Sequence, residues 1–72
     1  MQETLNFGKG QKPLVREILE GFELGQVTNY FEEVRAKHNG CTITLYDSGK
    51  VSIQGPSASV VKDEILSLMG LG

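Results

Sequence analysis

The fold is decided by residues 41–55, which read CTITLYDSGKVSIQG. Apolar and polar side chains alternate on both sides of residues 47–49, which is typical of two half-buried strands joined by a turn. A three-residue loop with Gly49 in the left-handed conformation pairs Leu45 with Val51. A two-residue loop would instead place apolar residues opposite polar ones along the whole ladder. We therefore expect a hairpin with one apolar face and one polar face.

The preceding segment, residues 27–39, fits two structures. A helix capped by Thr28 and ended by Gly40 is one of them. Its apolar stripe would consist of Val27, Tyr30, Phe31 and Val34. A strand is the other, because Asn39-Gly40 is a strong signal for a two-residue hairpin turn.

The register of that turn favours the strand. Val34 would lie opposite Leu45 and Ala36 opposite Ile43, so apolar residues meet on one face. The other face would pair Lys37 with Thr42, Arg35 with Thr44 and Glu33 with Tyr46. Glu32 is the misfit, since it would lie on the apolar side at the end of the strand.

The flanking residues predict two helices and one more strand. Pro13 is suited to begin a helix over residues 13–24. Its apolar face would consist of Leu14, Val15, Ile18, Leu19 and Phe22. A second helix would be capped by Ser57 and ended by Gly70. Its apolar face would consist of Ala58, Val61, Ile65, Leu68 and Met69, with Lys62, Asp63 and Glu64 facing water.

Near the start of the chain, Leu5 and Phe7 alternate with Thr4 and Asn6, which permits a short edge strand. The predicted class is α+β, in the order β-α-β-β-β-α, with both helices on one face of a small antiparallel sheet. At 72 residues, we expect one domain over residues 1–72 with a thin core.

The composition limits the function. Seven Lys and Arg against nine Asp and Glu give a net charge of −2, so electrostatics alone would hold nucleic acid poorly. The single cysteine, Cys41, forms no internal disulfide, and no apolar run is long enough to span a bilayer. We expect a reducing, cytoplasmic location and no membrane partner.

Catalytic and metal-binding groups are sparse. His38 and Cys41 would face each other across the first hairpin, but a zinc site needs at least three protein ligands. A nucleophilic pair at a hairpin edge would also lack an orienting group and an oxyanion hole. We predict a protein that is not an enzyme and that uses no cofactor or metal.

The polar face of the sheet is the candidate site. Its predicted binding residues are Arg35, Lys37, Thr42, Thr44, Tyr46, Lys50, Ser52 and Gln54. Cations can contact phosphates, hydroxyls and amides can bond sugar or bases, and tyrosine can stack. Three cations against Glu33 give this face a predicted charge of +2. The alternative is that these residues only suit strands and keep the face soluble.

The sequence resembles a known family over residues 33–55. The matching segments are Val34-Arg35-Ala36-Lys37, Gly40-Cys41-Thr42-Ile43-Thr44, Tyr46-Asp47-Ser48-Gly49-Lys50-Val51 and Gln54-Gly55. Together they resemble the N-terminal domain of bacterial ribonuclease HIII. The resemblance implies a TATA-binding-protein-like fold that helps hold an RNA/DNA hybrid. It also implies that Tyr46 and Lys50, with Gln54 beside them, contact the nucleic acid. The family's catalytic domain has no counterpart in these residues.

Two functions follow as hypotheses. The first is a stand-alone module that binds nucleic acid, as a duplex or a hybrid, on its open sheet. The second is a small homo-oligomeric interaction or inhibitor protein that regulates another protein or sequesters a nucleotide ligand. Its support is the open edge strands and an apolar tail of Leu66, Met69 and Leu71.

Overall fold

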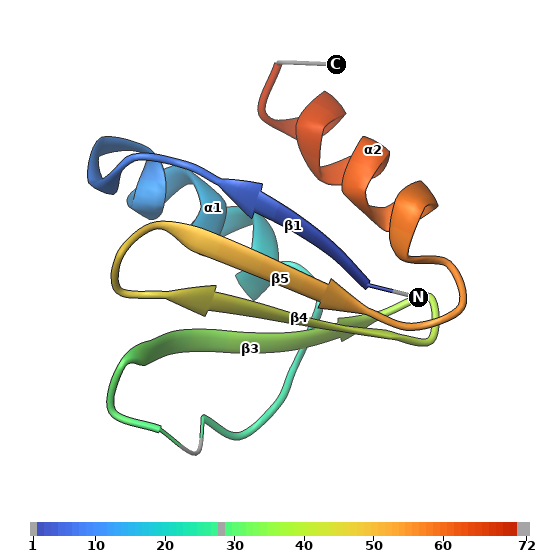
Figure 1. The fold of residues 1–72 in the computed structure, drawn as a ribbon, viewed down its shortest axis with the longest axis horizontal. Helices are drawn as coiled ribbons and strands as arrows, with labels where there is room; N and C mark the ends of the chain where they lie inside the picture. The colour runs from blue at the N-terminus through green and yellow to red at the C-terminus, as the bar shows by residue number, and fades with distance from the viewer. Residues whose placement is uncertain (1, 28, 71–72) are drawn as a thin grey trace.

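The computed structural model describes residues 2–27 and 29–70. The elements in chain order are β1 (Gln2–Asn6), the 3-10 helix η1 (Lys9–Gln11), α1 (Lys12–Glu20), β2 (Glu23–Leu24), β3 (Glu32–His38), β4 (Cys41–Tyr46), β5 (Lys50–Gln54) and α2 (Ala58–Leu68). The strands form one antiparallel sheet in the order β1-β5-β4-β3-β2 (Figure 1). Thr28 and Leu71 lie outside the described residues, and so do the predictions made for them.

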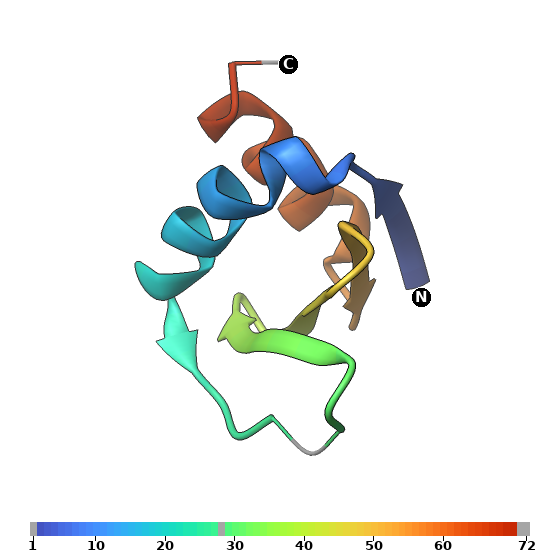
Figure 2. The same ribbon diagram turned by 90° about the vertical axis from the view of Figure 1, so that its left-hand side faces the viewer.

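Both helices cover the same face of the sheet (Figure 2). Val15 and Leu19 of α1 and Val61 and Ile65 of α2 are fully buried against the apolar side of the strands. The strands contribute Leu5, Val34, Ala36, Cys41, Ile43, Leu45, Val51 and Ile53 to this core. The predicted α+β class, with two helices on one face of a small antiparallel sheet, is confirmed.

The two hairpins have the predicted register. Asn39 and Gly40 have φ of 52° and 75°, as a two-residue hairpin turn requires, and His38 pairs with Cys41. The strand prediction for residues 33–37 is therefore confirmed, and the helix alternative is wrong. In the second hairpin, Leu45 pairs with Val51, as a three-residue loop requires.

Gly49 is required by the geometry of that loop. Its φ is 94°, and a Cβ at this position would collide with the carbonyl oxygen of Phe7. The backbone N–H of Phe7 donates to the carbonyl of Gly49 at 3.1 Å. The loop therefore holds the end of β1 as well as joining β4 to β5.

The first helix differs from the prediction of residues 13–24. It ends at Glu20 with Gly21 as its C-cap, after which Glu23 and Leu24 pair with Lys37 and Ala36 of β3. Residues that were predicted to form the last turn of the helix thus form β2, which is hydrogen-bonded to the edge of β3. Leu14, predicted to be apolar core, is 43% exposed.

The second helix also departs in detail. Ser57 occupies the N-cap position but makes no side-chain cap hydrogen bond. Leu68 lies 55% exposed instead of facing the core. Two residues expected to face water instead contact other side chains. Lys62 donates to Glu3 at 3.3 Å, and Glu64 lies 2.9 Å from His38.

The start of β3 holds the main correction. A β-bulge between Glu32 and Val34 pairs Glu32, and not Glu33, with Tyr46. A bulge inserts an extra residue and exchanges the faces of the residues before it. Glu32 therefore joins the polar face, and Glu33 instead meets Lys12 of α1 at 2.8 Å.

Candidate functional site

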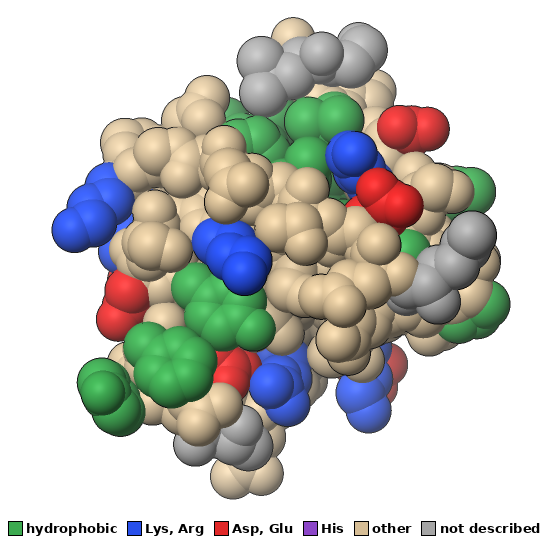
Figure 3. Space-filling model, in the orientation of Figure 1, with side chains coloured by type: hydrophobic (Ala, Val, Ile, Leu, Met, Phe, Trp, Pro, Cys, Tyr) green, Lys and Arg blue, Asp and Glu red, His purple; other side chains and the backbone are tan. Residues whose placement is uncertain are grey.

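The face of the sheet that the helices leave uncovered carries all eight predicted binding residues. In an antiparallel sheet, directly paired residues point to the same side. The pairs on this face are Arg35 with Thr44, Lys37 with Thr42, Thr42 with Gln54, Thr44 with Ser52, Glu32 with Tyr46 and Asn6 with Lys50. Figure 3 views this face, whose middle is mostly free of the colours that mark hydrophobic and acidic side chains. We call it the open face.

Sequence reasoning missed several residues of the open face. Gln2, Thr4 and Asn6 of β1 lie on it because they pair with Gln54, Ser52 and Lys50. Their alternation with Leu5 was a usable signal. Glu23 of β2 also lies on it, opposite Lys37.

A shallow depression occupies the middle of the open face. Its volume is about 340 Å³, and its lining residues are Arg35, Thr42, Thr44, Tyr46, Ser52 and Gln54. We call it the polar hollow. Thr44 and Ser52 are only 5% and 8% exposed, so these short side chains form its floor and the longer ones its rim. The predicted residues Lys37 and Lys50 lie outside it.

An ion pair fixes the guanidinium at the rim. Arg35 Nη2 donates to Glu32 Oε1 at 2.8 Å, and the Glu32 side chain is 1% exposed. The side-chain amide of Asn29 donates to the other carboxylate oxygen of Glu32. Arg35 Nε is buried without a hydrogen-bond partner within the described residues. A buried donor without a partner is costly.

Aromatic side chains gather at the bulged end of the open face. Phe31 stacks on Tyr46 with centroids 6.0 Å apart, and Tyr30 meets Phe31 edge-on at 5.5 Å. We call these three residues the aromatic platform. Lys50 Nζ lies 5.8 Å from the centre of the Tyr46 ring. Figure 3 shows hydrophobic side chains beside Lys and Arg at the lower left of this face.

Sequence reasoning considered Tyr30 and Phe31 only as part of the apolar stripe of the alternative helix over residues 27–39. It therefore missed their position beside Tyr46. The signal for it was available in principle, because two aromatic residues directly before a strand lie at the end of the sheet. Which face they join depends on the bulge, and no residue pattern indicated that bulge.

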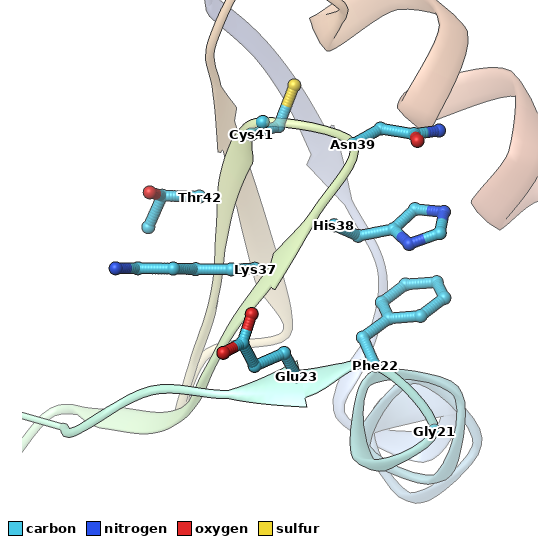
Figure 4. Close-up of a pocket in the computed structure, with 9 residues that line it drawn as sticks. Gly21, Phe22, Glu23, Lys37, His38, Asn39, Cys41 and Thr42 are labelled. Carbon is cyan, nitrogen blue, oxygen red and sulfur yellow. The ribbon is translucent and has the colours of Figure 1, made fainter.

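The other end of the open face is the hairpin at Asn39-Gly40. A hollow of about 780 Å³ lies there. Figure 4 shows Lys37 and Thr42 on one side of the sheet and His38 and Phe22 on the other. Glu23 lies beside Lys37 and adds a carboxylate that the sequence did not predict.

The charge of the face is therefore lower than expected. Three cations, Arg35, Lys37 and Lys50, share the strands of this face with two carboxylates, Glu23 and Glu32. The formal charge is +1, and the predicted value of +2 is wrong because the face contains a second acid.

His38 and Cys41 are paired across the hairpin as expected, but their side chains contact other parts of the chain. The His38 ring stacks on Phe22 with centroids 4.1 Å apart, and its Nε2 lies 2.9 Å from Glu64 Oε2. Cys41 is 1% exposed and belongs to the core. No cluster of three or more His, Cys, Asp or Glu able to hold a metal occurs in residues 2–27 and 29–70.

Lys12 of α1 contacts the bulge on the face of the sheet that the helices cover. Its ammonium donates to Glu33 Oε1 at 2.8 Å and to the carbonyl of Asp47 at 3.1 Å. The hydrogen bond from Lys12 holds the pKa of Glu33 below its ordinary value. The bulge is therefore tied both to α1 and to the loop after β4.

The fold is that of a domain found in a ribonuclease. The structure matches the crystal structure of Aquifex aeolicus RNase H3 with a TM-score of 0.65 and 22% sequence identity, over 92% of this chain and 26% of that chain. The resemblance to ribonuclease HIII is confirmed at the level of the fold. The chain spans about a quarter of the length of the protein it matches.

The chain belongs to the family described as Domain of unknown function (DUF3378), which matches residues 25–64. This range includes β3, β4, β5 and most of α2. No curated protein matches the sequence. Among the helices in the described part of the chain, none is long and apolar enough to cross a membrane.

Proposed function

We propose that the open face binds nucleic acid. The observation that carries this proposal is the polar hollow, in which one guanidinium, one phenol, one amide and three hydroxyls converge on about 340 Å³. Phosphates, sugars and base edges offer acceptors and donors to such groups.

The roles of the residues follow from their positions. Arg35 at the hollow and Lys50 beside it would contact phosphates, with Lys37 further along the same face. Tyr46 would stack or contact sugar. Thr42, Thr44, Ser52 and Gln54 would supply hydrogen bonds.

A double-stranded ligand, and above all an RNA/DNA hybrid, is the expected partner. The resemblance to bacterial ribonuclease HIII implies a domain that helps hold such a hybrid. The fold shared with Aquifex aeolicus RNase H3 supports the same use of the face here. We propose binding, and not cleavage, for these 72 residues.

Salt dependence is the first test. Labelled duplex DNA, duplex RNA and hybrid of one sequence would be titrated by fluorescence anisotropy over a series of salt concentrations. We expect a log–log slope of about −2 to −3, for two or three neutralised phosphates. A slope near zero would contradict contacts between the cations and the phosphates.

The second test removes two contacts. The double variant Tyr46→Ala with Lys50→Ala should weaken binding at least about tenfold, since the contact of Tyr46 with a sugar and the contact of Lys50 with a phosphate are lost. Arg16→Ala is the matched control, because Arg16 lies on the helix that covers the opposite face. Unchanged affinity of the double variant for all three ligands would remove the proposal.

The alternative of a homo-oligomer has less support from the fold. Leu66 and Met69 of its predicted apolar tail pack partly buried against the core. Leu71 lies outside the described residues. Sedimentation would decide the matter, because a stable oligomer that buries Tyr46 would leave no open face for nucleic acid.

A further inference from the structure

Folding makes little use of the aromatic platform. Tyr30 is 95% exposed and Phe31 is 45% exposed. Stabilisation by burial scales with the area removed from water, so the Tyr30 ring contributes almost none. Large exposed aromatic groups beside a polar surface mark a site of interaction. The platform therefore requires an explanation beyond the core.

The backbone holds the platform in place without a ligand. The N–H of Glu32 donates to the carbonyl of Asn29 at 3.1 Å, and the N–H of Asp47 donates to the carbonyl of Phe31 at 2.9 Å. The rings of Phe31 and Tyr46 are within 13° of parallel, and Tyr30 stands at 81° to Phe31. The parallel rings of Phe31 and Tyr46, with the Tyr30 ring upright beside them, offer a surface on which a flat molecule can stack.

Charge and position indicate which flat molecule fits. A hollow of about 410 Å³ beside the platform includes Phe31, Tyr46 and Lys50 in its lining. The Lys50 ammonium lies near the Tyr46 ring, where it can meet a phosphate attached to a stacked base. Tyr46 also lines the polar hollow, so the two sites are continuous. A nucleotide chain could pass from one to the other.

We infer that the aromatic platform binds one unpaired base of a nucleic acid whose double-stranded part lies on the polar hollow. The inference rests on the proposed function and adds to it the kind of nucleic acid that is bound. Within a duplex each base is stacked between its neighbours, so its face is free for an aromatic side chain only when the base is unpaired or splayed out. The structure thus assigns the open face to a junction between a duplex and a single strand.

The test compares two ligands and four proteins. A blunt hybrid and the same hybrid with a short single-stranded overhang would be titrated with the wild type, Phe31→Ala, Tyr30→Ala and Val60→Ala. Val60 is an apolar residue of α2 that is 58% exposed, which makes Val60→Ala the matched control. A 2-aminopurine at the first unpaired position would report stacking by a change in its fluorescence.

We expect the wild type to bind the overhang about tenfold more tightly than the blunt hybrid, as stacking of one base provides. Phe31→Ala should remove this preference and the fluorescence change, so that its affinities for the two ligands become equal. Tyr30→Ala should reduce the preference without affecting folding, because the Tyr30 side chain is 95% exposed. Val60→Ala should behave as the wild type.

Three outcomes would overturn the inference, and they are distinguishable. Equal affinity of the wild type for both ligands refutes the base site and leaves the proposed function standing. Binding of neither ligand at low salt refutes the proposed function and the base site together. A concentration-dependent dimer that Phe31→Ala abolishes would show that the occupant of the platform is a second copy of the chain.

Discussion

The two ends of β3 differ in what determines their structure. At the His38 end, Asn39-Gly40 forms a tight turn, and the pairs His38–Cys41 and Lys37–Thr42 continue without interruption. At the other end, a bulge between Glu32 and Val34 breaks the register. The first end follows from local turn chemistry and alternation, whereas the second depends on contacts with distant parts of the chain.

The difference has a functional meaning, because the bulge shapes one end of the candidate interface. It turns Glu32 toward Arg35 and turns Glu33 toward Lys12. It also brings Phe31 beside Tyr46. Bulges recur at sheet edges near functional sites, where they redirect side chains. The regular end provides stability, and the irregular end provides part of the surface that we propose binds nucleic acid.

The loop after β4 is where the bulged end is expected to be most sensitive. Gly49→Ala would place a Cβ against the Phe7 carbonyl in a residue with φ of 94°, so we expect a loss of roughly 2–4 kcal/mol in the free energy of unfolding. Urea denaturation would measure it. In Gly10→Ala the Cβ meets nothing within 4 Å, and the change should stay within about 1 kcal/mol. Equal effects of the two substitutions would contradict this account of the loop.

The Glu32–Arg35 pair tests whether the bulge is held by charge. Glu32→Gln keeps the shape of a side chain that is 1% exposed but removes its charge. We expect a loss of about 1–2 kcal/mol, moderated because Arg35 is partly exposed. Removing this carboxylate raises the formal charge of the open face from +1 to +2, so nucleic acid should bind more tightly, and the gain should be largest at low salt.

Glu23→Gln is the matched control for this substitution at the regular end. Glu23 lies opposite Lys37 and is exposed, so the free energy of unfolding should change by less than about 0.5 kcal/mol. If Glu23→Gln costs as much stability as Glu32→Gln, charge at the bulged end of β3 stabilises the fold no more than charge at the regular end.

The sequence predicted most of the sheet because each hairpin constrains both of its strands. Gly49 and Asn39-Gly40 fixed the loop lengths, and apolar alternation then left one register that buried Ile43 and Leu45. The eight predicted binding residues follow from that register, since they occupy the polar positions of the same strands. Their placement on the open face is confirmed, whereas their role in binding remains a proposal.

The remaining features depend on contacts between residues far apart in the sequence. The bulge is stabilised by Lys12, which is 21 residues from Glu33, and no local pattern indicates such a pair. The early end of α1 likewise reflects the pairing of Leu24 with Ala36. Both errors lie at ends of elements, where tertiary contacts outweigh local preference.

The regular end of β3 is also stabilised by side-chain contacts, which link the hairpin to both helices. His38 stacks on Phe22, which follows α1, and contacts Glu64 of α2. His38→Ala should lower the free energy of unfolding by about 1 kcal/mol through lost stacking and a lost hydrogen bond. A double-mutant cycle with Glu64→Ala should give a coupling of about 0.5–1 kcal/mol. Additive effects would show that the contact between the two side chains contributes nothing.

The smallest expected effect concerns the salt bridge behind the bulge and its dependence on pH. Because Lys12 lowers the pKa of Glu33 from its ordinary value of 4.5, the unfolded chain takes up this proton before the folded one does as the solution is acidified. The contribution of the Lys12–Glu33 salt bridge to the free energy of unfolding is therefore complete above pH 4.5. It is lost as the pH falls through the lower pKa of Glu33 in the folded state. At pH 7, Glu33→Gln should lower the free energy of unfolding by on the order of 0.5 kcal/mol. In acid, the variant and the wild type should have the same free energy of unfolding. Lys12→Met should remove the same acid-dependent part, and chemical denaturation across the acidic range would measure both. A difference that persists unchanged into acid would mean that Glu33 acts through its shape and not through its charge.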